Sequence, residues 1–374
     1  MREGVNHPVK NRAGISLRQF YIMTFGLTIG TSILIIPSGL AHTAREDAWI
    51  AALCSLLINL VIVILYLAVA RHYPGRDLYE ILEAGFGKWM GKIISLLYLF
   101  YFMILTGTLL GDLGFFITSE ILPETPIEAV QIIFLIAAVV SVSSGIVVFA
   151  RVCELLFPWV LFLFLILVLA LIPKIEWNHI KPVLEGGLSP VLIAGYQSAA
   201  FQELIVMMTF LPLVRKPKSG ERAFLLGTFT GGMILSIIVL LSLLILGIEQ
   251  TENSTFPAYA LAKTINIGNI LQRVEGILIT IWVLSFFIKI SLLYFSILKG
   301  LQSVFHLRKQ NYLIYPLAVL FIIIAWNTYI NTVYINEIIS KVWGNFAFIF
   351  LLLLPLLLYG LTLLKKTIHR LRTK

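Results

Sequence analysis

The chain has 374 residues, of which 59% are hydrophobic and only 13% are charged, and its mean hydropathy is +0.95. This composition excludes an ordinary soluble domain and is typical of a polytopic membrane protein. The net charge of +9 therefore indicates basic loops and tails at a lipid bilayer, and we do not expect a nucleic acid as a partner.

Ten apolar windows follow one another along the chain, each long enough to cross a hydrocarbon core of about 30 Å as a helix. They comprise residues 17–41, 47–70, 93–118, 127–148, 152–173, 190–214, 222–248, 274–299, 312–330 and 341–364. Most of the 28 lysines and arginines fall in the tails and in the loops on the side of the N-terminus, so we expect both termini in the cytoplasm. The sequence therefore predicts a single all-α transmembrane domain with cytoplasmic tails at residues 1–16 and 365–374.

Small and polar residues interrupt the first window near its middle, from Gly26 to Ser32. Irregular backbone at this depth is tolerated only where protein or a polar cavity surrounds it, so we predict a broken helix. The candidate ligand-binding residues of this break are Gly26, Thr28, Ile29, Gly30, Thr31 and Ser32. The alternative is that Gly26 and Gly30 only let another helix approach closely, which we expect of Gly227 and Gly231 in the seventh window.

Three shorter features lie in the regions that follow. Residues 73–83 start with turn residues and continue with helical spacing, which predicts a short cytoplasmic helix along the membrane surface. Residues 257–270 are expected to form an outer helix over the mouth of the bundle. In the third window Tyr98, Tyr101 and Thr106 are candidates for lining the ligand cavity, although aromatic residues in spans commonly serve as packing or interface anchors.

The sixth window has a similar interruption, from Gly195 to Glu203. If the first five windows (residues 17–173) are echoed by the second five (residues 190–364) as an inverted repeat, this break is the counterpart of the first one. Paired broken helices predict a binding site at the repeat interface, where exposed helix ends can hold an anionic group. The candidate ligand-binding residues here are Tyr196, Gln197, Ser198 and Phe201.

Lys289 lies inside the eighth window. A lysine at the centre of a membrane helix costs roughly 2.5 to 3.5 kcal/mol on insertion scales, so something should compensate its charge. In the functional interpretation its ammonium lines the cavity and stands in for a coupling cation. Glu203 is the expected counter-charge, and Asp112, Glu154 and Glu275, nearer the span ends, are the further candidates. The alternative is that the side chain snorkels toward the inner surface or forms a structural pair.

The remaining polar residues do not form a catalytic constellation. All six histidines lie in tails, loops or span ends, so the sequence indicates neither a metal site nor a Ser-His nucleophile within the bundle. We therefore expect no enzymatic activity, no metal and no cofactor. Asn59, Asn327 and Asn331 are expected to form hydrogen bonds between helices.

Six segments together carry a resemblance to a known family. They are Gly30-Thr-Ser-Ile-Leu-Ile-Ile-Pro37, Asp47-Ala-Trp-Ile50, Tyr73-Pro-Gly-Arg-Asp-Leu-Tyr-Glu80, Leu122-Pro-Glu-Thr-Pro126, Lys181-Pro-Val-Leu-Glu-Gly-Gly187, and Arg273-Val-Glu275 leading into Trp282. In their order and spacing, over nearly the whole chain, the sequence resembles the endospore germination permeases. These are the B subunits of spore germinant receptors, within the amino acid/polyamine permease superfamily.

The resemblance implies a LeuT-like fold of ten helices in an inverted five-plus-five repeat, with helices 1 and 6 broken. It implies that residues 29–33 receive a substrate carboxylate and that residues 196–203 form the counterpart in the sixth span. Here Phe201 stands where a glycine is usual and Ala199 where a bulky aromatic gate is common, and these departures count against efficient transport. The resemblance also implies partner A and C subunits and a location in the spore inner membrane.

Three functions remain open at this stage. The preferred hypothesis is a nutrient sensor: an amino acid binds between the first and sixth spans and shifts the bundle between two states, which triggers germination. The competing hypothesis is a secondary amino acid transporter coupled to H⁺ or Na⁺. A ligand-gated ion-conducting pore is the third.

Overall fold

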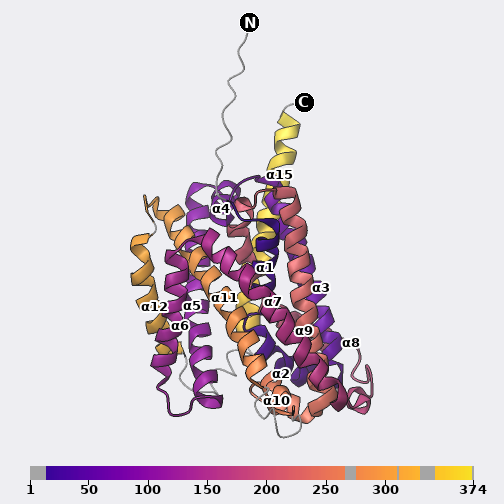
Figure 1. Cartoon of the computed structure of the whole chain (residues 1–374). Coiled ribbons are helices and arrows are strands. Elements are labelled where there is room, and N and C mark those ends of the chain that lie inside the picture. The colour runs from indigo at the N-terminus through magenta and orange to yellow at the C-terminus, as the bar shows by residue number, and fades with distance from the viewer. Residues whose placement is uncertain (1–13, 266–274, 310, 329–341, 373–374) are drawn as a thin grey trace.

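A computed structural model of the chain describes residues 14–265, 275–309, 311–328 and 342–372. These residues form helices and the loops between them, apart from one isolated bridge between Ile15 and Val214. The molecule is an all-α polytopic bundle (Figure 1). Among the described residues, six helical stretches are long and apolar enough to cross a membrane, and the bent pair in the sixth window raises this number to seven.

Helices occupy each of the ten predicted windows. In chain order they are α1 (Leu17–Ile29) with α2 (Ser32–Ala44), α3 (Ala48–His72), α5 (Lys88–Glu120), α6 (Ile127–Ser143), α7 (Ile146–Leu171), α8 (Leu188–Ala199) with η4 (Leu204–Thr209) and η5 (Leu211–Leu213), α9 (Pro217–Asn253), α11 (Glu275–Phe305), α12 (Ile314–Thr328), and α14 (Gly344–Phe348) with η8 (Ile349–Leu353) and α15 (Leu354–Arg372). The helices α1 and α2 have 13 residues each and are therefore about 20 Å long. Neither crosses a core of about 30 Å alone, so the two together make the first span.

Glycines on α9 allow it to lie directly on α1. A Cβ atom added to Gly227 would lie 2.7 Å from Thr24 Cβ, and one added to Gly231 would lie 2.8 Å from Thr28 Cβ. No side chain other than hydrogen fits at such distances, which is the physical basis of close packing through small residues in membranes. The predicted packing role of Gly227 and Gly231 is thus confirmed.

The two shorter predicted helices lie at opposite ends of the bundle, as Figure 1 shows. At one end, α4 (Leu78–Phe86) begins with a capping box in which Asp77 and Glu80 each accept a backbone hydrogen bond from the other at 3.0 Å. Lys365 near the end of α15 donates to the Gly85 carbonyl of this helix at 2.6 Å. At the other end, α10 (Pro257–Lys263) corresponds to the first part of the predicted outer helix. The residues of that prediction from 266 onward lie outside the described ones.

The prediction for the asparagines is wrong for two of the three. Asn59 donates to the Ser55 carbonyl and Asn327 to the Ile323 carbonyl, in each case one turn back on the same helix. A short amide side chain reaches its own backbone without help from a neighbouring helix. Asn331 lies outside the described residues.

Candidate functional site

The first break consists of Gly30 and Thr31, which separate α1 from α2. It is shorter than the predicted interruption from Gly26 to Ser32, because the Gly30 N–H still donates to the Gly26 carbonyl at 2.9 Å and extends the helical pattern. Gly30 has φ +27° and ψ −123°, and a Cβ atom on it would lie 2.4 Å from Lys289 Cδ. Both the backbone angle and the close approach of a neighbouring side chain therefore require glycine here.

The second break, residues 200–203, separates α8 from η4. The α-helix continues through Ala199, so this break is also narrower than the predicted one. Glu203 adopts the left-handed conformation with φ +40° and ψ +42°, and the axes on either side are bent by 41°. The segment after the break is a tighter 3₁₀ helix, so the sixth span changes both direction and helix type at this break.

Lys289 of α11 joins the two breaks. Its Nζ atom lies 2.6 Å from Glu203 Oε2 and donates to the Phe201 carbonyl at 2.8 Å and to Thr31 Oγ1 at 3.1 Å. Two of the three ammonium donors make these hydrogen bonds, whereas the contact with Glu203 is an ion pair without hydrogen-bond geometry, since Glu203 Oε2 accepts no hydrogen bond among the described residues. The predicted pairing of Lys289 with Glu203 is thus confirmed as a structural contact.

Lys289 does not snorkel. It stands 14 residues after the first residue of α11, which places it about 21 Å along a helix of 31 residues. The side chains of Lys289 and Glu203 are 0% and 1% exposed. The charge is therefore held at the middle of the helix and balanced by its contacts with the protein.

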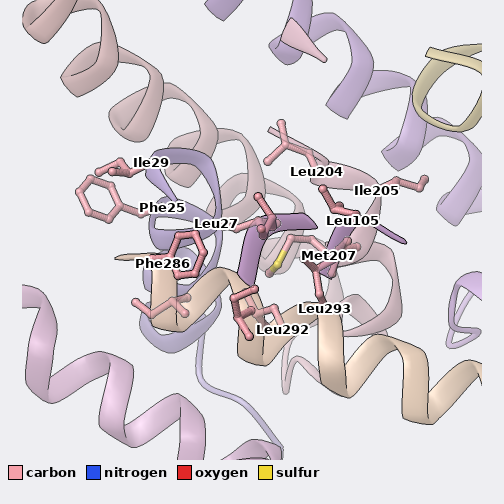
Figure 2. Close-up of a cluster of buried hydrophobic side chains, with 14 of the residues drawn as sticks. Phe25, Leu27, Ile29, Leu105, Leu204, Ile205, Met207, Phe286, Leu292 and Leu293 are labelled. Atoms are coloured by element: carbon pink, nitrogen blue, oxygen red, sulfur yellow. The ribbon is translucent and has the colours of Figure 1, made fainter. Parts of the chain in front are cut away.

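The elements α11 and η4, which carry or flank this contact, also contribute to an apolar cluster (Figure 2). Figure 2 shows side chains from α1, α5, η4 and α11 gathered together. They are Phe25, Leu27, Ile29, Leu105, Leu204, Ile205, Met207, Phe286, Leu292 and Leu293, all buried. Water is excluded from such surroundings, so an unpaired charge here is costly and a paired one is strongly held.

The predicted residues of the first break divide between two faces of α1. Ser32 donates to the Phe201 carbonyl at 3.2 Å and so joins Thr31 at the second break. A Cβ on Gly26 would lie 2.7 Å from Ile288 Cδ1, which places this glycine against α11. Thr28, in contrast, donates to the Thr24 carbonyl and packs beneath Gly231 of α9.

The third-span candidates also differ from one another. Tyr98 donates to the Phe350 carbonyl at 2.7 Å, and Thr106 donates to the Phe102 carbonyl of its own helix at 2.7 Å. Tyr101 stacks on the Phe350 ring with centroids 4.5 Å apart, and its hydroxyl is buried without a hydrogen-bond partner in the described part of the chain. Of the three, only Tyr101 has a polar group available to something else.

The predicted residues of α8 make contacts with groups other than Lys289. The Tyr196 ring stacks on Phe348 at 4.0 Å, and Gln197 Oε1 accepts a long hydrogen bond of 3.5 Å from Thr43. Ser198 Oγ is buried and has no partner among the described residues. Phe201 takes part through its carbonyl, which accepts from both Lys289 and Ser32.

Sequence reasoning missed Tyr66 and the π-helix η8. Tyr66 of α3 donates to the Leu351 carbonyl at 2.6 Å, so two tyrosines from different spans, Tyr66 and Tyr98, donate to carbonyls of η8. The sequence could have indicated Tyr66, because it is a tyrosine within the apolar second window. It could not have indicated η8, because that segment contains only apolar residues.

The chain is similar to spore germination proteins. The family model described as "Spore germination protein" matches residues 14–333. Spore germination protein KB of Bacillus subtilis (strain 168) is 28% identical over 361 residues, which is 95% of this chain and 96% of that protein. Spore germination protein B2 of the same organism is 25% identical over 370 residues, with 96% and 98% covered.

Solved transporter structures have a similar fold. Mhp1, a nucleobase-cation-symport-1 family transporter in a closed conformation with bromovinylhydantoin bound, superposes with a TM-score of 0.67 at 15% identity, over 94% of this chain and 80% of that one. MhsT in complex with L-phenylalanine gives 0.63 at 13% identity, over 97% and 99%. At this identity the likeness concerns the fold alone, and it confirms the predicted LeuT-like, all-α class.

Proposed function

The chain belongs to the family of spore germination proteins, and from this premise we propose that it is the nutrient-sensing B subunit of a spore germinant receptor. In this proposal a small nutrient, an amino acid, binds at mid-membrane depth between the first and sixth spans. Binding shifts the bundle between two states and so triggers germination. The protein is of the permease class and is not an enzyme.

The meeting of the two breaks at Lys289 carries the proposal. The first span and the sixth span are both interrupted, and one side chain contacts both interruptions. The helix α2 begins at Ser32 without a side-chain cap, and the first amides of any helix lack intrahelical partners. Backbone groups of this kind, at the middle of a LeuT-like bundle, are suited to hold the polar ends of a small solute.

The second candidate function is a secondary transporter coupled to H⁺ or Na⁺, and the transporter folds of Mhp1 and MhsT favour it. The contacts of Lys289 argue against coupling to Na⁺. Its ammonium is already placed among three oxygens, the ligand type that a hard coupling cation would require. While Lys289 is paired with Glu203, its ammonium occupies the position among these oxygens that a coupling cation would need.

The wider assembly is part of the same proposal. We place the chain in the spore inner membrane together with A and C subunits, with both termini in the cytoplasm. Basic residues at the α4 end of the bundle, among them Arg71, Arg215 and Lys365, support this orientation by the positive-inside rule.

The test compares two glycines near the first break. In purified protein we expect amino acid binding, measured as a rise in melting temperature, without saturable gradient-driven uptake in reconstituted vesicles. Gly30→Leu should abolish binding because its side chain would collide with Lys289. Gly39→Leu, in α2 with no atom within 4 Å of the added Cβ, should retain it. Gradient-driven uptake by the wild-type chain would favour the transporter, and unchanged binding in Gly30→Leu would remove the first break from the site.

A further inference from the structure

The ion pair at the breaks has the chemistry of a zwitterion. It places one ammonium and one carboxylate 2.6 Å apart, with the ammonium also on the Phe201 carbonyl and on Thr31 Oγ1. A free amino acid carries the same two groups on a single carbon atom. Lys289 and Glu203 therefore already make, within the protein, the kind of contacts that such a ligand would make.

The Tyr101 hydroxyl is a second, independent observation that concerns the same region. Its side chain is 0% exposed, and its hydroxyl has no partner among the described residues. Stacking on Phe350, with the ring planes 5° apart, fixes the direction of the hydroxyl. The helix α5, which carries Tyr101, packs against α11, which carries Lys289. A buried hydroxyl without a hydrogen-bond partner is unfavourable, so the Tyr101 hydroxyl, unpaired among the described residues, is available to donate to a bound polar group.

We propose that Lys289 occupies the ligand position in the closed state as a tethered ammonium, and that a zwitterionic amino acid binds by separating Lys289 from Glu203. The ammonium of the ligand takes over the oxygens of Glu203 and Phe201. Its carboxylate pairs with the displaced Lys289 and accepts a hydrogen bond from Tyr101. This inference rests on the proposed nutrient-sensing function and names the residues that select the ligand.

The selection follows from charge balance. A zwitterion leaves both members of the opened pair with a partner. A ligand with a single charge leaves either Lys289 or Glu203 unpaired in an apolar environment, which is the costly outcome of breaking a buried pair. An uncharged ligand provides no counter-charge for either residue. The closed pair therefore discriminates against both classes.

The experiment uses the full chain purified in detergent and its melting temperature. The probes are the free protein amino acids, the amide and the N-acetyl derivative of each active one, and glucose and inosine as uncharged nutrients. We expect at least one amino acid to raise the melting temperature, with its amide and its N-acetyl derivative at least about 100-fold weaker. That loss corresponds to an unpaired buried charge.

Paired variants separate recognition from folding. Lys289→Met with Glu203→Gln removes both charges, a replacement that buried ion pairs often tolerate, and should lose the amino acid response. The matched control is Lys263→Met with Glu120→Gln, which removes a partly exposed pair of 2.9 Å at the outer end and should keep the response. If the buried double variant fails to fold, Tyr101→Phe provides the test, with an expected affinity loss of about tenfold.

The outcomes distinguish the inference from the function on which it rests. A comparable response to a derivative, to glucose or to inosine would overturn the ion-pair exchange and leave nutrient binding intact. An unchanged amino acid response in the neutral double variant or in Tyr101→Phe would also overturn the ion-pair exchange. If none of the probes stabilises the wild-type chain, the inference and the proposed function both fail.

Discussion

Two buried polar side chains, Lys289 and Tyr101, differ in how completely the protein satisfies them. Lys289 donates two hydrogen bonds and forms an ion pair with Glu203, whereas the Tyr101 hydroxyl has no hydrogen-bond partner among the described residues. Their neighbour Tyr98, one turn earlier on α5, donates to the Phe350 carbonyl. The same side-chain type thus has two different environments on one helix, which gives a direct comparison.

Tyr98→Phe and Tyr101→Phe should separate stability from recognition. Tyr98→Phe leaves the Phe350 carbonyl without its donor, and we expect a loss of about 0.5–1.5 kcal/mol in the free energy of unfolding. Tyr101→Phe removes a hydroxyl that has no partner among the described residues, so stability should not fall. Melting curves of the two purified variants without ligand make the comparison. A larger drop for Tyr101→Phe would show that its hydroxyl is already satisfied by a group such as water.

The residue pairing at the site was predictable and the residue directions were not. A lysine in an apolar window demands a counter-charge, and Glu203 in another interrupted window was the available acid near mid-depth. The directions depend on helical phase, because positions two apart on a helix differ by about 200°. Gly26 therefore faces α11 while Thr28 faces α9. The residue types of the break do not show which of its residues faces α9 and which faces α11.

At the scale of the elements, α1 is held between two neighbours that use its two faces. Thr24 and Thr28 pack against Gly227 and Gly231 of α9 on one face. On the other face, Lys289 of α11 lies against Gly30. The breaks themselves were predicted from small and polar residues. Their length was overestimated, because glycine and serine are compatible with helix where backbone bonds such as Gly30 N–H to Gly26 O persist.

Alanine at two glycines tests the α1–α9 contact. In Gly231→Ala the new Cβ would lie 2.8 Å from Thr28 Cβ and 3.2 Å from the Phe25 carbonyl, so the helices must separate. We expect a loss of about 1–3 kcal/mol in stability, which is typical of overpacking. Gly360→Ala in α15 has no atom within 4 Å of the added Cβ and should gain up to about 1 kcal/mol through helix propensity. Equal melting temperatures for the two variants would contradict the packing role.

For the whole molecule, the ends of three spans are held together at the α4 end of the bundle. The N-terminal segment pairs with the end of the sixth span: Ile15 donates to the Leu213 carbonyl at 3.0 Å, and Arg215 donates to the Ile15 carbonyl at 3.2 Å. Nearby, Ser296 of α11 contacts both Tyr79 of α4 and Thr209 of η4. The first, sixth and eighth spans are therefore tied to one another on this side, in addition to their contact at Lys289.

If binding shifts the bundle between two states, separating these span ends is the expected movement, and a disulfide tests it. Ile15 and Val214 form a parallel bridge, and paired strands lie about 4.8 Å apart, within the Cα separation that a disulfide spans. In a background with Cys54 and Cys153 replaced by alanine, we expect Ile15→Cys with Val214→Cys to cross-link on oxidation. The oxidised protein should lose its response to an amino acid, measured as melting temperature or as germination, and a reductant should restore it. The single Ile15→Cys variant, treated identically, controls for oxidation itself. A full response from the cross-linked protein would show that the first and sixth spans stay together at the α4 end during signalling. The movement would then have to occur on the α10 side of Lys289.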